Sequence, residues 1–469
     1  MSSVSALNSL LSGSSAINLS SILEAALGAS TPGIDVNSAV SASLSAAEAP
    51  EQAWANQQST LQNQASALNQ LQSQAGSLDS DMQALNSLTG PLSATTVTSS
   101  NPAILTASSA SGTTLGNNVV VVNSLASTAS WASGSYQSGT SALPAGSFTI
   151  TTAGGATATI TTNGTTTLNA VATQINGDNL GVTASVIADA TGSRLAIVSN
   201  TSGSAANFTV TSPQLAAYGF TQAGIGSNAA LTVDGISISS ATNTVTGAIP
   251  GLTLNLLGSN PSAQVTLAVT PDGSQASSAI NQFVSDYNSL IQSVSAQYND
   301  TGSGEGVLSS DPTVNSLQTA LFQAIDYSNQ PTTGTTTIPN LSSLGITVGS
   351  NGTLSINTAT LNSALQNNFG DVKTFFQGSA LNGFANALDH QLTNFTSPAD
   401  GAFTVDLQSI NAENTALQTD INNFQTNVIT PLKAQLTTEY SNAEIALQQL
   451  PNELRNIDAE LGLNSSSKS

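Results

Sequence analysis

Apolar side chains recur every three or four residues along the C-terminal part of the chain. This spacing is typical of a helix that buries one stripe against another helix. Pro431 and Pro451 lie within the stripe, and each should kink or divide the helix because proline removes a backbone hydrogen bond. The stripe consists of Leu407, Ile410, Leu417, Ile421, Phe424, Val428, Leu432, Leu436, Tyr440, Ala443, Leu447, Leu450, Leu454, Ile457 and Leu461.

A matching stripe near the other end predicts a long helix over residues 48–89, ended by Gly90-Pro91. Its apolar positions are Trp54, Leu61, Leu68, Ala75, Leu78, Met82 and Leu85. Long helices at both ends suggest that the termini come together as a stalk. Residues 1–45, rich in Ser and Ala, are expected to be poorly ordered in isolation.

Between residues 93 and 272 the periodicity changes to short β-branched or alternating runs separated by Gly and Asn. Such runs predict strands joined by turns, with one short helix over residues 168–175. Helical spacing returns after Pro271, with helices expected around residues 279–294, 312–326, 358–377 and 379–395. A hairpin of residues 345–348 and 353–356 is expected to turn at Asn351-Gly352, a strong signal for a two-residue turn.

These elements predict an α+β protein. Both chain ends form a helical stalk or coiled-coil body, and antiparallel β-sandwich-like domains are inserted into it. We expect terminal helices in residues 1–45 and 430–469, a helical body in 46–92 and 273–429, a β domain in 93–135 and 228–272, and a second β domain in 136–227.

Charge excludes some partners. The 469 residues include 26 Asp and Glu but only five Lys and Arg, for a net charge of −21. Nucleic acid and anionic membrane surfaces are therefore not expected partners. There is no Cys, no stretch of about 20 apolar residues to span a bilayer, and no conventional signal peptide. We expect any export to occur without a cleaved Sec signal.

Several short motifs follow one another in a fixed order from about residue 33 to residue 450. They are Gly33-Ile34-Asp35-Val36-Asn37, Val233-Asp234-Gly235, Asn243-Thr244-Val245, Ile249-Pro250-Gly251-Leu252-Thr253-Leu254, Phe283-Val284-Ser285-Asp286-Tyr287-Asn288, and Leu344-Gly345-Ile346 with Gly352-Thr353-Leu354-Ser355-Ile356. In this order the motifs resemble those of the flagellar hook-associated protein 2 family, the filament cap proteins.

The resemblance implies a structural protein at the distal end of the flagellar filament, outside the cell, that promotes folding and insertion of exported flagellin. It implies a ring-like homo-oligomer of about four to six subunits. Other implied partners are hook–filament junction proteins and a cytoplasmic export chaperone at the C-terminal helix. The residues expected to dock on the filament or on other subunits are Leu447, Leu450, Leu454, Ile457, Leu461, Ile22 and Leu23.

No catalytic, cofactor or metal site is predicted. His390 is the only histidine, and we interpret it as a helix-surface residue beside Asp389. Asp79 and Asp81 point to different faces of their helix, which favours a solvated role. Trp54 is expected in the core, and Trp131 in a loop, where either partner contact or packing is open. A calcium site in a β-domain loop also stays open, without the spacing of a known calcium motif.

Three alternatives remain at this point. The first is another flagellar axial protein, such as a hook–filament junction protein or a flagellin. The second is an exported adhesin that binds mucin or other glycans through its Thr-rich β domains. The third is a polysaccharide hydrolase with two catalytic carboxylates, which the scarcity of acids in the β region disfavours.

Overall fold

A computed structural model describes residues 35–298, 306–329 and 337–460. They form two compact units, one from the described parts of 1–77, 289–322 and 390–469, the other from 78–288 and 323–389. Long helices alternate with antiparallel sheets, which confirms the predicted α+β class. The predicted division into terminal helices, body and two β domains remains a prediction.

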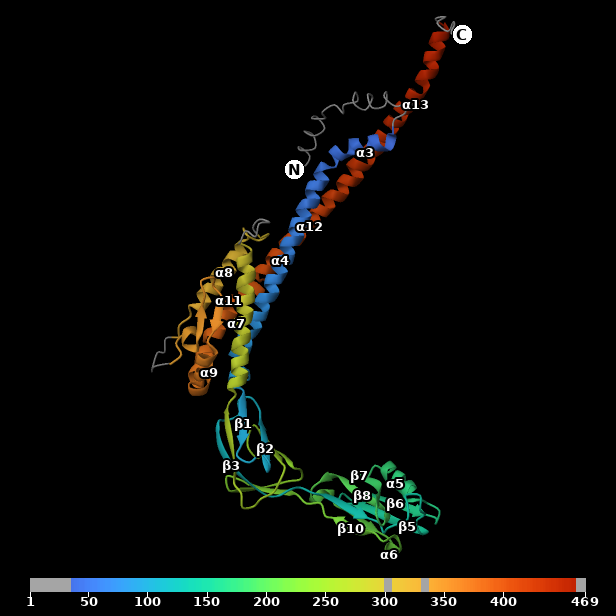
Figure 1. The fold of residues 1–469 in the computed structure, drawn as a ribbon, viewed down its shortest axis with the longest axis vertical. Helices are drawn as coiled ribbons and strands as arrows, with labels where there is room; N and C mark the ends of the chain where they lie inside the picture. The colour runs from blue at the N-terminus through green and yellow to red at the C-terminus, as the bar shows by residue number, and fades with distance from the viewer. Residues whose placement is uncertain (1–34, 299–305, 330–336, 461–469) are drawn as a thin grey trace. The chain divides into compact units, whose positions relative to one another are not determined.

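The first unit is built on antiparallel helices. Helix α3 (Val36–Ala47) and the first part of α4 (Ala49–Asn86) run alongside α12 (Ala402–Phe424) and α13 (Thr430–Glu460), as Figure 1 shows. Amide side chains fix the direction, since Gln57 Nε2 donates to Glu413 Oε1 at 2.9 Å and Gln72 Nε2 donates to Thr404 Oγ1 at 3.3 Å. Ser43 and Tyr440 share a hydroxyl hydrogen bond of 2.9 Å.

Helix α3 lies mostly within residues 1–45, where we expect a terminal helix, and the poor order of that segment in isolation remains a prediction. The Asp35 side chain caps it by accepting hydrogen bonds from the backbone N–H groups of Asn37 and Ser38, at 3.1 and 3.2 Å. The helix then buries Ala39, Val40 and Leu44. A cap and a packing partner therefore stabilise a segment that its Ser/Ala content alone did not support. Residues 1–34 lie outside the described part of the chain.

The two prolines of the C-terminal stripe behave differently. A π-helical turn, η4 (Gln425–Ile429), separates α12 from α13 directly before Pro431, so this prediction is confirmed. Across the turn, the Thr430 N–H donates to the Gln425 carbonyl, five residues back. Pro451 lies inside α13, which continues to Glu460, so the helix is not divided there, and a kink at this proline remains a prediction.

In the second unit, residues 95–126 and 229–271 contain two antiparallel sheets with a shared core. One sheet has the strand order β1-β15-β3-β11-β12 and the other β13-β14-β2. Leu105, Val120, Leu231, Leu254 and Leu267 lie in the core, each at most 1% exposed. The strands are β1 (Thr95–Ser99), β2 (Leu105–Ser109), β3 (Gly116–Ser124), β11 (Ala229–Val233), β12 (Ile236–Ser240), β13 (Thr244–Thr246), β14 (Leu252–Leu256) and β15 (Val265–Pro271), with the 3₁₀ turn η1 (Pro91–Ser93) before β1.

A second pair of sheets occupies residues 128–224. Their strand orders are β10-β4-β8-β7 and β6-β5-β9. The predicted short helix is confirmed as α5 (Leu168–Gly177). The remaining elements are β4 (Thr128–Ala132), β5 (Gly146–Thr152), β6 (Thr157–Thr162), β7 (Val182–Asp189), β8 (Gly192–Ser202), η2 (Ser204–Ala206), β9 (Phe208–Thr211), α6 (Leu215–Tyr218) and β10 (Thr221–Gly224).

The two tryptophans lie in different surroundings. Trp54 is partly buried and packs edge-on against Phe424, with ring centroids 5.4 Å apart, so it lies at the edge of the core rather than inside it. Trp131 lies in strand β4 rather than in a loop. Its indole N–H donates to the Phe208 carbonyl at 3.0 Å, and the ring packs on the core of this β region. The Ser- and Gly-rich sequence around Trp131 does not indicate a strand, because this strand is defined by its pairing with the neighbouring strands of the sheet.

Four asparagine side chains each bind both backbone groups of one distant residue, and we call them the asparagine clamps. In each, the side-chain oxygen accepts from the N–H and the side-chain nitrogen donates to the carbonyl, with all distances between 2.7 and 3.0 Å. Buried backbone groups need such partners. The pairs are Asn176 with Ala184, Asn207 with Gly226, Asn243 with Ala126, and Asn288 with Leu354.

The Val-Asp-Gly motif serves a similar purpose. Asp234 and Gly235 turn the β11–β12 hairpin with positive φ angles of 48° and 85°. The Asp234 N–H donates to the Val119 carbonyl at 2.8 Å, and its carboxylate accepts from the Val119 N–H at 2.8 Å. The turn therefore completes the hydrogen bonds of the neighbouring strand β3.

Helices and one hairpin complete the fold. The elements are α7 (Gly273–Ala296), α8 (Pro312–Ile325), η3 (Leu341–Leu344), β16 (Ile346–Val348), β17 (Leu354–Ile356), α9 (Thr358–Asn367), α10 (Phe369–Gln377) and α11 (Phe384–Thr396). An aromatic cluster of Phe283, Tyr327, Phe375, Phe376 and Phe384 packs α7, α10 and α11 together.

The predicted β16–β17 hairpin is confirmed, but its turn is longer than expected. Gly349 N–H donates to the Thr353 carbonyl at 2.7 Å, and Gly352 N–H donates to the Gly349 carbonyl at 3.0 Å. Gly352 has a φ of 79°. This is a three-residue loop whose last position is left-handed, rather than a two-residue turn.

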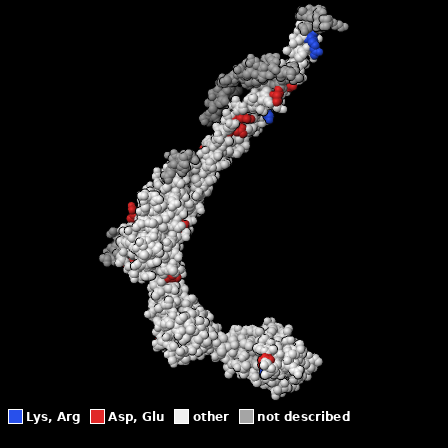
Figure 2. Space-filling model, viewed as in Figure 1, with Lys and Arg blue, Asp and Glu red and all other residues white. Residues whose placement is uncertain are grey.

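Charged side chains are sparse over the surface, as Figure 2 shows for one face. Among the described residues, one ion pair forms, between Arg194 Nε and Asp189 Oδ2 at 3.6 Å, and the two side chains are 41 and 48% exposed. Exposed ion pairs stabilise folds little. Apolar cores and amide or hydroxyl hydrogen bonds therefore hold this chain together.

Candidate docking surface on the C-terminal helix

The first half of α13 has a partner. Leu436 and Tyr440, each 7% exposed, pack with Ala39, Val40 and Leu44 of α3. Phe424 and Ile429 extend this cluster across the π-helical turn, and Val428 and Leu432 pack at its edge. The structure buries Ile429 more deeply than Val428, which the regular spacing had placed on the stripe. The extra residue in the π-helical turn accounts for this change.

The second half of α13 continues the same stripe without a partner in the described part of the chain. Leu447 is half-buried, whereas Leu450, Leu454 and Ile457 are 48, 54 and 49% exposed. These four positions lie three or four residues apart and follow directly from Leu436 and Tyr440, so they share one helix face. We call Leu447, Leu450, Leu454 and Ile457 the outer stripe.

Four of the seven predicted docking residues therefore lie on one exposed helix face. Leu461, Ile22 and Leu23 lie outside the described residues, so the structure does not bear on them. A docking role for any of the seven remains a prediction. Ile445, which is 53% exposed, lies on the opposite face of the helix and offers a natural comparison.

The outer stripe can bury apolar area against another helix. Burying a large aliphatic side chain fully contributes about 1.5–3 kcal/mol. Because the three exposed members are about half accessible, covering them would contribute roughly 3 kcal/mol before the entropic cost of association. Such a contact is weak alone, and it gains strength when several copies dock together.

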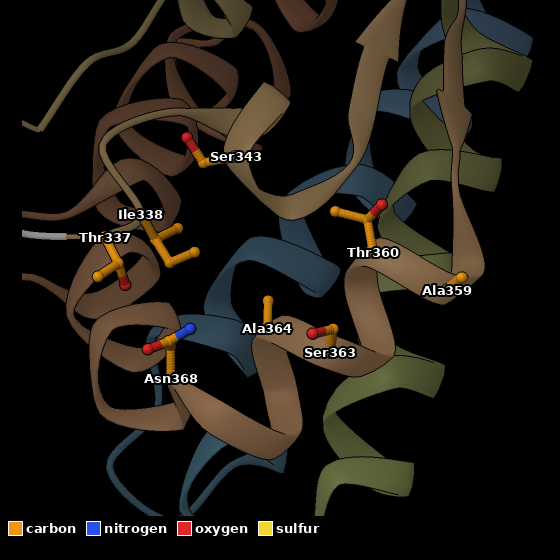
Figure 3. A pocket seen from close by; sticks show the side chains of 8 residues that line it. All are labelled: Thr337, Ile338, Ser343, Ala359, Thr360, Ser363, Ala364 and Asn368. Atoms are coloured by element: carbon orange, nitrogen blue, oxygen red, sulfur yellow. The ribbon is translucent and has the colours of Figure 1, made fainter.

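The second unit also has a shallow groove. It has a volume of about 430 Å³ and is formed by the segment before η3, by η3 and α9, and by the residue between α9 and α10. Figure 3 shows hydroxyl, methyl and amide groups around it, with no ionisable side chain among its lining residues, which are Thr337, Ile338, Ser343, Ala359, Thr360, Ser363, Ala364 and Asn368. The groove lacks a general acid, a general base and an activated nucleophile.

Residues that could bind a metal ion also do not cluster in the described part of the chain. Within the residues that the structure describes, no three Asp, Glu or His side chains come close enough to hold a metal ion. His390 is exposed on α11, as the sequence predicted. Over the same residues, no helix combines the length and apolar content that crossing a bilayer requires.

Asp79 and Asp81 correct a prediction. They do point to different faces of α4, but neither face is simply solvated. Burial, and then the facing Asp389 carboxyl group, raise the pKa of Asp79 to about 7. Burial, and then Asp286, raise the pKa of Asp81 to about 7. The sequence could not reveal these pairs, because each partner lies more than two hundred residues away.

Other carboxylates act as helix caps. Hydrogen bonds from Ser274 and Gln275 hold the pKa of Asp272 below its usual value at the start of α7. Burial raises the pKa of Asp311, which caps α8 by accepting from the N–H groups of Thr313 and Val314. Sequence reasoning singled out neither these caps nor the asparagine clamps, although an Asp directly before a helix is a usable signal.

Sequence comparisons support the resemblance. A family model described as flagellar hook-associated protein 2 N-terminus matches residues 32–129, and one described as flagellar hook-associated protein 2 C-terminus matches residues 226–452. A flagellin hook IN motif matches residues 147–201. The chain is 27% identical over 438 residues to the B-type flagellar hook-associated protein 2 of Pseudomonas aeruginosa, covering 82% of this chain and 87% of that protein.

A solved structure shares the fold. The D1-D2-D3 domains of the flagellar cap protein FliD from Escherichia coli match with a TM-score of 0.55 and 25% identity, covering 74% of this chain and 99% of theirs. The two family models together match the described helical regions and the first pair of β-sheets. This chain therefore belongs to the flagellar hook-associated protein 2 family.

Proposed function

We infer that this protein caps the distal end of a bacterial flagellar filament and promotes the folding and insertion of exported flagellin subunits. Membership of the hook-associated protein 2 family carries this conclusion. The role is structural, and we propose that the protein is not an enzyme. The uncharged lining of its groove supports that view. The comparisons give no preference to the glycan-binding alternative.

We propose that the outer stripe docks the cap on the filament. Its support is the continuity between a buried seam and an exposed one on the same helix face. A helix with one apolar stripe gains most of its stability from packing, so the exposed half should become ordered and covered on assembly. The predicted residues Leu461, Ile22 and Leu23 would extend this surface.

The remaining partners follow from the family role. We propose a ring-like homo-oligomer of about four to six subunits, with flagellin and hook–filament junction proteins as neighbours. A cytoplasmic chaperone would cover the C-terminal helix before export. Export would proceed without a cleaved Sec signal, and the protein would act outside the cell at the flagellum tip.

Gene deletion and complementation test this function. Cells without the gene should have short or missing filaments and release monomeric flagellin into the medium. Electron microscopy and an immunoblot of the medium measure both effects. The full chain should restore filaments, whereas a chain ending at Tyr440 should not, although circular dichroism should show its β regions folded. Normal filaments in the deletion strain would overturn the cap function. Normal filaments with the truncated chain alone would overturn only the docking role of α13.

A further inference from the structure

Two pairs of facing carboxyl groups lie between helices of the second unit. The Asp79 carboxyl group on α4 faces that of Asp389 on α11, close enough for a hydrogen bond once one of the two carries a proton. Two residues further along α4, the Asp81 carboxyl group faces that of Asp286 on α7 in the same way. Ionised carboxylates only accept hydrogen bonds, so a bond between two carboxyl groups requires that one of them carries a proton.

The surroundings make this proton important. Asp79 Oδ1 and Asp81 Oδ2 are buried from solvent, and no donor reaches either atom among the described residues. The other Asp79 oxygen accepts a hydrogen bond from Gln83 Nε2 at 3.1 Å. Leu78, Met82 and Leu85 flank the two acids on α4 and are each 0% exposed. An ionised carboxylate at these atoms would lose hydration without gaining a hydrogen-bond donor.

No cation on the neighbouring helices compensates. On α10, Lys373 Nζ donates to Ser93 Oγ at 2.9 Å, and Asp371 is held by Thr337. On α7, the neighbour of Asp286 is Tyr287, which is fully buried. On α11, His390 follows Asp389 and is exposed. Arg194, the other basic residue of this unit, lies beside Asp189 in the β region.

We propose that the pairs Asp79–Asp389 and Asp81–Asp286 form a proton-dependent latch that holds α11 and α7 against α4 at mildly acidic pH and loosens as the pH rises through neutrality. The two pairs sit on one short stretch of α4 and reach two different helices. Losing their protons would therefore weaken two helix contacts together. The inference does not depend on the capping function.

The direction of the effect follows from proton linkage. The ordinary pKa of an Asp carboxyl is 3.8, and burial with a facing carboxyl raises the pKa of Asp79 and of Asp81 to about 7. Between these values the folded chain holds protons that the unfolded chain has released. Stability is then greatest at the acidic end, and it falls as the pH rises from about 4 towards 7.

An isosteric double variant tests the latch in the full-length chain. In Asp79→Asn/Asp81→Asn, each amide supplies a permanent N–H donor to the facing carboxylate, whatever the pH. Hydrogen exchange, corrected for its intrinsic pH dependence, would be followed by mass spectrometry between pH 5 and 8. Peptides from residues 78–86, 280–290 and 384–392 report on the three helices directly.

In the wild-type chain these peptides should lose protection about tenfold or more as the pH rises, since one pKa unit corresponds to tenfold in an equilibrium. The double variant should keep its protection across the range and exceed the wild type at pH 8. The control Asp326→Asn/Asp420→Asn changes the same charge at exposed positions and should behave like the wild type. If the Asp79/Asp81 variant lost protection in parallel with the wild type, the latch would be wrong.

A second variant tests the latch if the first variant fails to fold. If the Asp79/Asp81 variant were unfolded at every pH, Asp286→Asn/Asp389→Asn would place the amides on the opposite partners. Protection of the same peptides that stays constant from pH 5 to 8 would support the latch. A wild-type-like pH dependence in this second variant would contradict it.

Discussion

Residues 430–440 and 441–460 of α13 carry one apolar stripe with the same spacing and the same kinds of side chain. In the first segment the stripe packs on α3, and Leu436 and Tyr440 are each 7% exposed. In the second, Leu450, Leu454 and Ile457 are about half exposed. Helical periodicity therefore locates a stripe but does not show what covers it. Four variants, in order of decreasing effect, test the difference between the two segments and extend the comparison to the second unit.

The largest effect is expected from the exposed segment, on assembly rather than on folding. Leu450→Ser/Leu454→Ser should change the free energy of unfolding of the isolated chain by no more than about 1 kcal/mol, because each exposed substitution usually costs under 0.5 kcal/mol. Filament length in complemented deletion cells should nevertheless fall to that of the deletion strain. Ile445→Ser on the opposite face should leave filament length unchanged. Equal filaments with both variants would remove the distinction between the faces.

A substitution in the covered segment should affect folding rather than assembly. Leu436→Ala should lower the free energy of unfolding of the first unit by about 2–4 kcal/mol, since it empties a packed site. Trp54 lies in the same apolar cluster, so its fluorescence during urea denaturation is a local reporter, with Trp131 replaced by Phe to remove the second signal. Leu450→Ala in the same background is the control and should cost under about 0.5 kcal/mol. Similar losses for the two would mean that both segments are covered.

The second unit extends the comparison from apolar to polar contacts. Asn288→Ala removes both hydrogen bonds to the Leu354 backbone and should destabilise the β16–β17 hairpin by about 1–3 kcal/mol. Asn281→Ala, on the same helix, removes only local bonds to Ser277. Hydrogen exchange of residues 345–356 would measure the difference. If both variants exchanged alike, the clamp would contribute nothing to the hairpin.

The smallest effect is expected for Asp272, a partly exposed acid with hydrogen-bond donors, in contrast to the carboxyl pairs. Asp272 accepts from the Ser274 and Gln275 N–H groups, and these bonds with that of the Ser274 hydroxyl hold its pKa below 3.8. Its contribution is therefore present above pH 4 and lost as the pH falls through the lowered pKa. Asp272→Asn should cost about 0.5 kcal/mol at pH 7, and the wild type and variant should converge near pH 3. If the stabilities of the wild type and the variant converged at alkaline pH instead, the ionised Asp272 carboxylate would not be the stabilising form.

Periodicity was sufficient for the long elements and for the fold class. Helix α4, helix α5 and the β16–β17 hairpin are where the apolar spacing and turn residues placed them. It was insufficient where a distant contact determines the outcome. Helix α3 depends on α13, the strand containing Trp131 depends on β8 and β10, and Asp79 and Asp81 depend on partners on other helices. A single sequence contains no local signal for such pairings.

The docking residues show the same limit. Spacing identified Leu447, Leu450, Leu454 and Ile457 as one face, because a three–four repeat is a property of the helix itself. It could not distinguish them from Leu432 or Leu436, which carry the same repeat. In the described part of the chain, the two sets of residues differ only in whether α3, which begins at Val36, covers them.

The π-helical turn before Pro431 sets the rotational phase of everything that follows it. One residue beyond the normal helical repeat rotates the downstream face by about 100°. With this turn, Phe424 and Ile429 lie in one cluster, five residues apart. Deleting a single residue from Gln425–Ile429 would turn the whole of α13 about its axis, so that Leu436 and the outer stripe would leave their present side together. The length of this one turn therefore determines the direction in which the outer stripe faces, although the turn lies about thirty residues before the end of α13.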